Sequence, residues 1–262
     1  MTGAITGDYA GSAYEFNNTR DYNFPIITGE SGITDDSILT IAVADAILHD
    51  KSYGECLHYW GNKSNPPKGG YGGLFYKWLK SDNPKPYNSW GNGSAMRVSP
   101  AGWAFNTLEK TLAEAKKSAE CTHNHPEGIK GAQAIAASVY LLRTGSDKQN
   151  IKNFVETEFG YDLDFKLADI RSAHTFDESC MDTVPKSIVC FLESRDFEDA
   201  IRLAVSLGGD SDTLACITGA MAEAAYGTDN IPKQLITAAV YYIPEELSII
   251  YHSFVQKFIN KK

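Results

Sequence analysis

The hydrophobic positions along this chain recur mostly with the period of a helix. Three segments are apolar on nearly every face: Ile33–Leu48, Gly131–Leu142 and Thr213–Tyr226, the last two being rich in Ala and Gly. Helices of this kind are buried, and small side chains let their axes approach closely. We therefore expect these three segments at the centre of the fold.

Amphipathic helices are predicted in six further segments. These are Leu108–Glu120, Ile151–Phe159, Pro185–Glu193, Phe197–Ser206, Lys233–Tyr241 and Glu245–Phe258. Strand-like patterning is limited to short β-branched fragments around Phe24–Thr28. Gly61–Gly73 and Ser81–Gly93 are dense in Gly, Pro and Asn and are predicted to be loops. Since no linker separates two cores, the sequence predicts one all-α domain over residues 1–262.

Composition narrows the class of protein. Of 262 residues, 43% are hydrophobic and 22% charged, a balance typical of a globular chain. The sequence contains no apolar run of about 18 residues, so we expect no membrane-spanning helix. The first 16 residues lack the pattern of a secretory signal. The net charge of −9 disfavours nucleic acid as a partner. Five cysteines without a CxxC pair are typical of reduced thiols, so we expect a cytoplasmic protein. The absence of heptads favours a monomer.

Two clusters of carboxylates and hydroxyls stand directly before two of the apolar helices. They comprise Thr34, Asp35 and Asp36 in the first cluster, and Asp210, Asp212 and Thr213 in the second. Each cluster alone could be an ordinary helix cap. Four carboxylates at the starts of buried helices, however, would have to take up protons or bind a cation. Oxygen ligands suit Mg²⁺ or Mn²⁺, whereas Ala215 excludes an EF-hand because that loop requires a glycine there.

Glycines accompany the second cluster and also recur in the opening segment. Gly208 and Gly209 precede the second cluster and would let the backbone come close to whatever the metal holds. The opening segment carries Asp8-x-x-Gly11-x-x-x-Glu15. Because glycines also recur there at every fourth position from Gly3, close helix packing is a sufficient explanation of this pattern.

Two further motifs could contact a ligand. A loop entering a helix contains Ser89, Trp90, Gly91, Asn92 and Gly93. Its glycine amides could bind an anion and its indole could stack on a base, although an Asn-Gly turn anchored by Trp90 would look the same. Neither a Walker motif nor GxGxxG is present.

A His-x-His pair, His123 and His125, precedes the helix that starts near Pro126. No Cys or His at a fitting distance completes a zinc set. Contact with a ligand and capping of the following helix both remain open for these side chains.

In this order, the motifs GAITGDYAGSAYE, TDDS, GNGSAMRVSP, THNHPEG and VSLGGDSDTLACITGAMAEAAYG resemble the ADP-ribosylglycohydrolase family. That family includes the dinitrogenase-reductase-activating and ADP-ribosyl-acceptor hydrolases. The resemblance covers nearly the whole chain. It implies an orthogonal all-helical bundle with a binuclear Mg²⁺ or Mn²⁺ centre at helix N-termini. The implied metal ligands are Thr34, Asp35, Asp36, Asp210, Asp212 and Thr213. Ser37 stands where relatives often have Thr, but the hydroxyl is kept.

The resemblance also implies roles for the other motifs. Glu15, Asp36, Asp210 and Asp212 would be the catalytic carboxylates. Ser89 to Gly93, His123, Gly208 and Gly209 would bind ADP-ribose, with Trp90 stacking on the adenine.

The implied activity is metal-dependent hydrolysis that releases ADP-ribose from a modified protein. Its transition state should resemble an oxocarbenium ion. Three alternatives are a hydrolase of a small ADP-ribose or ribosyl derivative, a non-catalytic ADP-ribose-binding module, and a structural bundle with well-capped helices. Leaving-group specificity would lie in the loops Gly61–Gly73 and Arg171–Thr183.

Overall fold

The structure is a computed structural model that describes residues 1–64 and 67–260. The described part of the chain is helical and contains no strand, only one isolated antiparallel bridge between Gly91 and Ser179. The expected all-α class is therefore confirmed. None of the described helices is long and apolar enough to cross a membrane.

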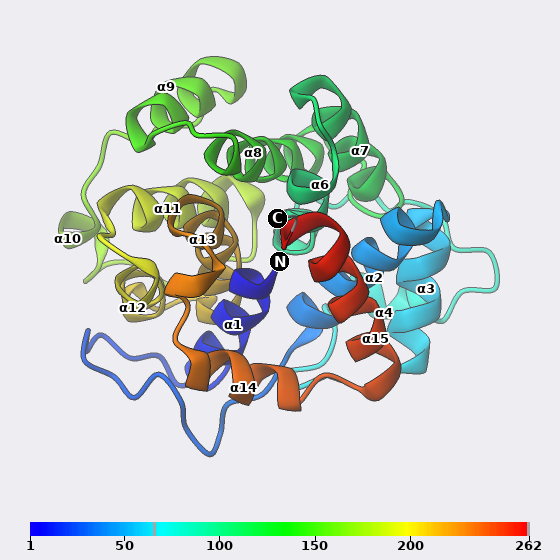
Figure 1. Ribbon diagram of the computed structural model, residues 1–262, viewed down its shortest axis with the longest axis horizontal. Helices are drawn as coiled ribbons and strands as arrows, with labels where there is room; N and C mark the ends of the chain where they lie inside the picture. The colour runs from blue at the N-terminus through cyan, green and yellow to red at the C-terminus, as the bar shows by residue number, and fades with distance from the viewer. Residues whose placement is uncertain (65–66, 261–262) are drawn as a thin grey trace.

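Figure 1 labels most of the helices, and its colours follow their order along the chain. In order, they are α1 (Thr2–Gly11), α2 (Asp35–His49), α3 (Tyr53–Lys63), α4 (Gly73–Leu79), α5 (Gly93–Met96), α6 (Ser99–Ala104), α7 (Leu108–Glu120), α8 (Pro126–Arg143), α9 (Lys148–Phe159), α10 (Leu167–Ile170), α11 (Cys180–Glu193), α12 (Phe197–Leu207), α13 (Ser211–Tyr226), η1 (Thr228–Asn230), α14 (Lys233–Tyr241), α15 (Glu245–Phe254) and the π-helical turn η2 (Val255–Ile259).

Most predicted helices occur where the sequence placed them, and the differences lie at their ends. α7 and α14 match their predicted bounds. α11 starts five residues before the predicted Pro185, because the Ser179 side chain accepts a hydrogen bond from the Asp182 amide and caps the helix there. The predicted helix at Glu245–Phe258 changes to a π turn after Phe254. The Phe24–Thr28 fragments form no strand.

The predicted loop Gly61–Gly73 is only partly a loop. α3 extends into it as far as Lys63, α4 begins at Gly73, and residues 65–66 lie outside the described part. Ser81–Gly93 is irregular as predicted, until α5 begins at its last residue.

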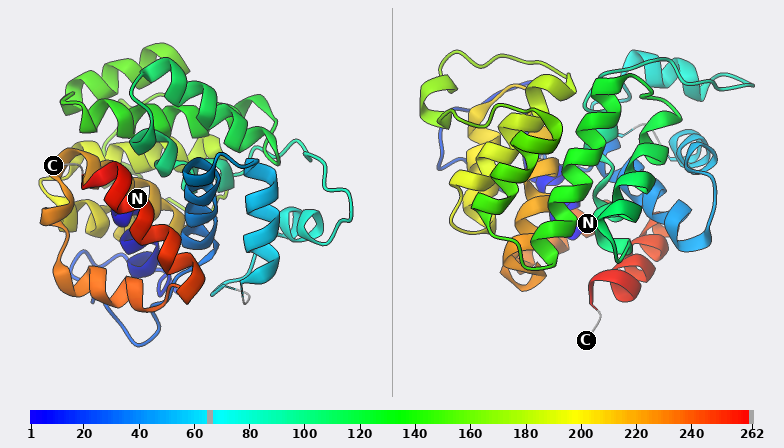
Figure 2. Two further views of the ribbon diagram at one scale, coloured as in Figure 1. Left: turned by 45° about the vertical axis from the view of Figure 1, so that its right-hand side comes forward. Right: turned by 90° about the horizontal axis from the view of Figure 1, so that it is seen from above.

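The core is built around the contact between α1 and α13. All ten residues of α1 are buried, and in the further views later helices largely hide this blue helix (Figure 2). A Cβ atom at Gly7 would lie 2.1 Å from the carbonyl oxygen of Ala215, and one at Gly3 would lie 2.2 Å from that of Gly219. Real Cβ atoms essentially never come within 3.0 Å of such a neighbour. The glycines of α1 therefore serve close helix packing, and this packing brings the end of α1 to the start of α13.

Candidate metal centre and substrate cavity

The two carboxylate clusters meet although they are far apart in the sequence. The Thr213 hydroxyl at the start of α13 donates to Asp36 Oδ2 at the start of α2, at 3.4 Å. Asp35, Asp36, Asp210, Asp212 and Thr213 line one cavity of about 620 Å³. This convergence excludes the alternative of a structural bundle whose acidic caps lie apart on the surface.

Ordinary capping explains only part of this arrangement. Thr34 is the N-cap of α2, and its side chain accepts a hydrogen bond from the Asp36 amide at 3.2 Å. Asp210 occupies the N-cap of α13 but makes no capping hydrogen bond with its side chain. Its Oδ2 instead accepts a 2.7 Å hydrogen bond from Asn92 Nδ2. The second cluster therefore directs its carboxylates toward the cavity rather than toward its own helix.

Asp8 of α1 joins the first cluster from a neighbouring helix. Its carboxylate accepts hydrogen bonds from the Thr34 amide at 3.0 Å, from the Thr34 hydroxyl at 2.8 Å and from the Ser37 amide at 3.1 Å. The Ser37 hydroxyl also donates to it, so the Ser that replaces Thr keeps a working donor. Burial raises the pKa of Asp8 and these hydrogen bonds lower it; burial is the larger effect, and the resulting pKa is about 6. Asp8 thus fixes α1 against the start of α2.

The carboxyls around the cavity oppose one another's ionisation. Burial is the largest cause of their raised pKa values, and repulsion from neighbouring carboxylates raises these values further. Together they raise the pKa of Asp35 and Glu15 to about 8 and that of Asp36, Asp210 and Asp212 well above the usual range. A divalent cation among these groups would remove the repulsion.

The donor set fits such a cation. Asp36 Oδ1 and Asp212 Oδ1 are buried and have no hydrogen-bond partner within the described residues. Carboxylate oxygens of Glu15, Asp210 and Asp212 lie within 4.8 Å of one another. Buried carboxylate oxygens are seldom left without a partner, and an oxygen-only set is what hard cations prefer. The cluster is therefore an acidic site that could hold metal.

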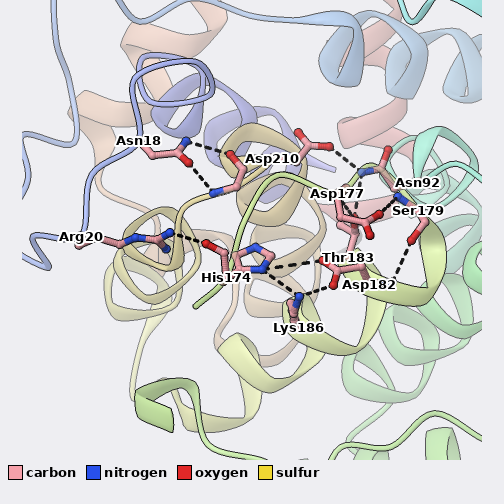
Figure 3. A network of polar contacts seen from close by, with 11 residues as sticks. Asn18, Arg20, Asn92, His174, Asp177, Ser179, Asp182, Thr183, Lys186 and Asp210 are labelled. Carbon is pink, nitrogen blue, oxygen red and sulfur yellow. Dashed lines mark hydrogen bonds and ion pairs between the residues drawn. The ribbon is translucent and has the colours of Figure 1, made fainter. Parts of the chain in front are cut away.

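Asn92 links the acidic cluster to α11. Its side chain donates to Asp210 and also to the Thr183 hydroxyl at 3.0 Å (Figure 3). Asn92 thus lies beside the acidic cluster as well as in the predicted substrate loop.

Most of the predicted substrate residues line the same cavity, namely Ser89, Gly91, Asn92, Gly93 and His123. Trp90 lies outside the lining, with 53% of its surface exposed and its ring edge-to-face with His125. His125 caps α8 through a 3.1 Å hydrogen bond from the Glu127 amide. His125 therefore has the predicted capping role, and His123 lines the cavity.

Gly208 and Gly209 face side chains of this protein rather than the cavity. Both have positive φ, 73° and 76°. A Cβ at Gly208 would lie 2.5 Å from the Arg20 guanidinium, and one at Gly209 would lie 2.5 Å from His174 Nε2. The Asn18 side chain binds both the amide and the carbonyl of Gly209, and Arg20 donates to the His174 carbonyl (Figure 3). The two glycines thus leave room for the side chains of Asn18, Arg20 and His174 to pack around the turn that precedes Asp210.

Both loops expected to set specificity contribute to the cavity. Gly69 to Gly73 lines it from one loop, and Phe176 and Glu178 line it from the other. Arg97 also lines it and was not among the predicted site residues, nor was Asp8. Arg97 belongs to the quoted GNGSAMRVSP motif, and a charged residue directly after the apolar Ala95-Met96 pair was the available signal.

Comparison with known proteins tests the resemblance seen in the sequence. The family described as ADP-ribosylglycohydrolase matches residues 1–259. The chain belongs to this family. An ADP-ribosylglycohydrolase is a glycosidase-type hydrolase, so the protein is an enzyme of that class.

Individual relatives agree with this assignment. The chain is 25% identical to human ADP-ribosylhydrolase ARH3, over 98% of this chain and 92% of that protein. It is 26% identical to ADP-ribosylarginine hydrolase Tri1 of Pseudomonas putida, over 56% of this chain and 41% of that protein. A solved structure, titled ADP-ribosylglycohydrolase-related protein complex, superposes with a TM-score of 0.71 at 20% identity, covering 97% of this chain and 94% of that one. This last likeness concerns the fold.

Proposed function

We propose that this ADP-ribosylglycohydrolase cleaves the N- or O-glycosidic bond between the distal ribose of ADP-ribose and a protein side chain, and that it depends on two Mg²⁺ or Mn²⁺ ions. The observation that carries the proposal is the meeting of both carboxylate clusters in one cavity with the Ser89–Gly93 loop. The names of its relatives support ADP-ribose as the released group.

Both carboxylate clusters would supply oxygen ligands to such a metal centre. The residues that would hold the cations are Thr34, Asp35, Asp36, Asp210, Asp212 and Thr213. Bound there, the cations would supply the positive charge that orients a ribose diol and lowers the pKa of a water molecule.

The protein's own carboxylates would do the proton work. Asp210 or Asp212 accepts the proton of the attacking water, and Asp36 lies beside them with an Oδ1 that has no partner among the residues the structure describes. Glu15 is half-buried at the wall of the cavity next to Gly69. It assists, either by activating water or by controlling access to the cluster. A group doing general acid or base work contributes about 10²–10⁴-fold to the rate.

The substrate loop would hold the rest of ADP-ribose. Ser89, Gly91, Asn92, Gly93 and His123 contact its phosphates and ribose from the cavity wall. Trp90, half-exposed next to Gly91, offers its ring to the adenine, and Gly208 and Gly209 act through the turn that presents Asp210. We also propose that residues 1–262 form one domain that works as a cytoplasmic monomer, in line with its five free thiols.

The decisive experiment measures free ADP-ribose by mass spectrometry. Proteins ADP-ribosylated on arginine or serine and a small ADP-ribose conjugate are incubated with the wild type, with Asp212→Ala and with Asp45→Asn. Asp45 is a suitable control because it is a buried carboxylate near the far end of α2. We expect metal-dependent release by the wild type and by Asp45→Asn, and none by Asp212→Ala.

Thermal unfolding gives a second readout. Mg²⁺ or Mn²⁺ at about 100 times its Kd should stabilise the wild type by about 2.7 kcal/mol and should leave Asp212→Ala unchanged. Full turnover in EDTA, or full turnover by folded Asp212→Ala, would contradict the metal-dependent mechanism. ADP-ribose binding without release from any substrate would favour a binding module, and release from the small conjugate alone would favour a hydrolase of free derivatives.

A further inference from the structure

Arg97 is a buried cation that forms no ion pair within the described part of the chain. Its side chain is fully buried, and its Nε and Nη1 atoms have no hydrogen-bond partner there. Only Nη2 is engaged: it donates to the Ser118 carbonyl at 3.1 Å and to the Thr122 hydroxyl at 2.7 Å. Because a buried charge is poorly screened, the guanidinium acts strongly on the groups that it touches.

Thr122 stands between this cation and His123. Its Oγ1 lies 2.7 Å from His123 Nδ1. A guanidinium can only donate hydrogen bonds, so Oγ1 accepts from Arg97. If Nδ1 also donated to Oγ1, the hydroxyl proton would need a different acceptor. If Nδ1 is unprotonated, it accepts that proton, and both the Thr122 hydroxyl and Nδ1 have a partner.

Two other groups approach the Thr122 side chain and could accept its proton. They are the Tyr87 hydroxyl and the Cys121 thiol. Burial raises the pKa of both groups, so each stays protonated. A phenol oxygen and a thiol sulfur are weaker hydrogen-bond acceptors than the lone pair of an imidazole nitrogen, which favours His123 Nδ1 as the acceptor.

The other ring nitrogen of His123 faces the substrate loop. A Cβ atom at Gly93 would lie 3.1 Å from His123 Nε2, and one at Gly91 would lie 3.6 Å from it. His123 also lines the cavity. Burial, followed by the nearby charge of Arg97, lowers the pKa of His123 well below its usual value, so the ring is neutral at neutral pH.

We propose that Arg97 and Thr122 are positioning residues that fix the tautomer of His123. Arg97 donates to Thr122, Thr122 donates to Nδ1, and the single imidazole proton is held on Nε2. His123 then presents a permanent donor to an oxygen acceptor bound at Gly91–Gly93, without carrying a charge of its own. The identification of that acceptor as a phosphate oxygen of ADP-ribose rests on the proposed function. The tautomer of His123 is inferred independently of that function.

The tautomer is measurable in the ligand-free protein. Two-bond ¹⁵N–¹H correlation spectra of the full chain distinguish protonated from unprotonated ring nitrogens, and His123→Gln assigns the signals among six histidines. The wild type should show His123 protonated on Nε2 alone. Thr122→Val removes the hydroxyl with little change of shape, and should give a second set of signals with Nδ1 protonated. Calorimetric titration with ADP-ribose should then show a Kd raised about tenfold, the loss expected for a hydrogen bond to a charged oxygen.

Three further variants separate this role from a merely structural one. Thr122→Ser keeps the hydroxyl and should keep both the tautomer and the Kd. Tyr87→Phe should keep the tautomer, because its hydroxyl is not the acceptor. Thr111→Val removes a buried hydroxyl near the other end of α7, where it donates to the Thr107 carbonyl, and should change neither readout.

The proposal and the proposed function can fail separately. A proton on Nδ1 in the wild type overturns the proposal by itself, even if Thr122→Val does not fold. An unchanged tautomer and an unchanged Kd in folded Thr122→Val also overturn it. If the wild type holds the expected tautomer but does not bind ADP-ribose, the proposed function fails and the relay from Arg97 to His123 stands.

Discussion

The contact between α1 and α13 predicts a graded response to single methyl groups. Replacing Gly3, Gly7 or Gly11 by Ala places a Cβ at 2.2, 2.1 or 2.4 Å from a carbonyl oxygen of α13. Real Cβ atoms essentially never come closer than 3.0 Å to such a neighbour. The three new methyl groups would therefore come about 0.8, 0.9 and 0.6 Å too close. Backbone cannot rotate out of the way as a flexible side chain can, so the two helices must separate.

The loss of stability depends on how large the overlap is, and the loss of function depends on how close the glycine lies to the acidic cluster. Overpacking a core costs about 1–3 kcal/mol, and Gly7→Ala should lie at the upper end. Gly11→Ala overlaps least but pushes on Asp212, whose Cα lies 2.5 Å from the new Cβ. Gly3 lies eight residues away, about 12 Å along the helix. We therefore expect Gly7→Ala to lose most stability and Gly11→Ala to lose most metal affinity and activity.

Urea unfolding followed by circular dichroism, together with metal titration of the folded variants, measures both effects. Gly54→Ala is the control: it adds the same methyl group to α3, where the nearest atom, Cys121 Cβ, is at an ordinary 3.4 Å. In a helix that change should stabilise by about 0.5–1 kcal/mol. If Gly7→Ala unfolds at the same urea concentration as the wild type, the close packing described here is not what holds α1.

Two other expectations concern single side chains. Burial alone would raise the pKa of Asp45, but hydrogen bonds from Trp60 and His49 lower it. Ionised Asp45 therefore stabilises the folded protein at pH values above its unfolded pKa of about 3.9. This stabilisation is lost as the pH falls through the pKa of Asp45 in the folded protein. Asp45→Asn should thus cost about 1–3 kcal/mol at pH 7 and progressively less toward acid, and an equal loss at all pH values in urea unfolding would contradict this assignment. Trp90→Ala should weaken ADP-ribose binding by about 1–3 kcal/mol if the exposed indole stacks on adenine, whereas an unchanged Kd in calorimetry would leave the ring only its contact with His125.

The parts of the fold that local patterns encode could be predicted from the sequence. The apolar runs of α2 and α13 mark buried helices without knowledge of what surrounds them. α3 was missed because its composition is mixed and Gly61 interrupts it. That glycine fits against Leu79, whose Cδ2 would lie 2.7 Å from a Cβ there, a contact that only the folded chain contains. A local signal did exist, since Ser52 and Glu55 have the spacing of a capping box and Ser52 caps the helix.

The site was predictable in its residue types but not in its assembly. Acidic clusters before two apolar helices can be read from the sequence, whereas the distance between the clusters depends on how α1 packs. Asp8 was noted in the opening motif but was given no role, for the same reason: its partners Thr34 and Ser37 belong to the start of another helix, 26 and 29 positions away. Gly208 and Gly209 looked like ligand contacts, and their neighbours Arg20 and His174 are visible only in three dimensions.

The packing of α1 on α13 also has a consequence for synthesis of the chain. Gly11 and Ser211, which are hydrogen-bonded to each other, are 200 residues apart. At ribosomal speeds of about 5–20 residues per second, the segment that forms α1 waits about 10–40 s for its partner to be made. Rich in glycine, it is a weak helix by itself. A nascent chain therefore lacks the complete acidic site until α13 has emerged, and cation capture would report that α13 has been made and has packed against α1.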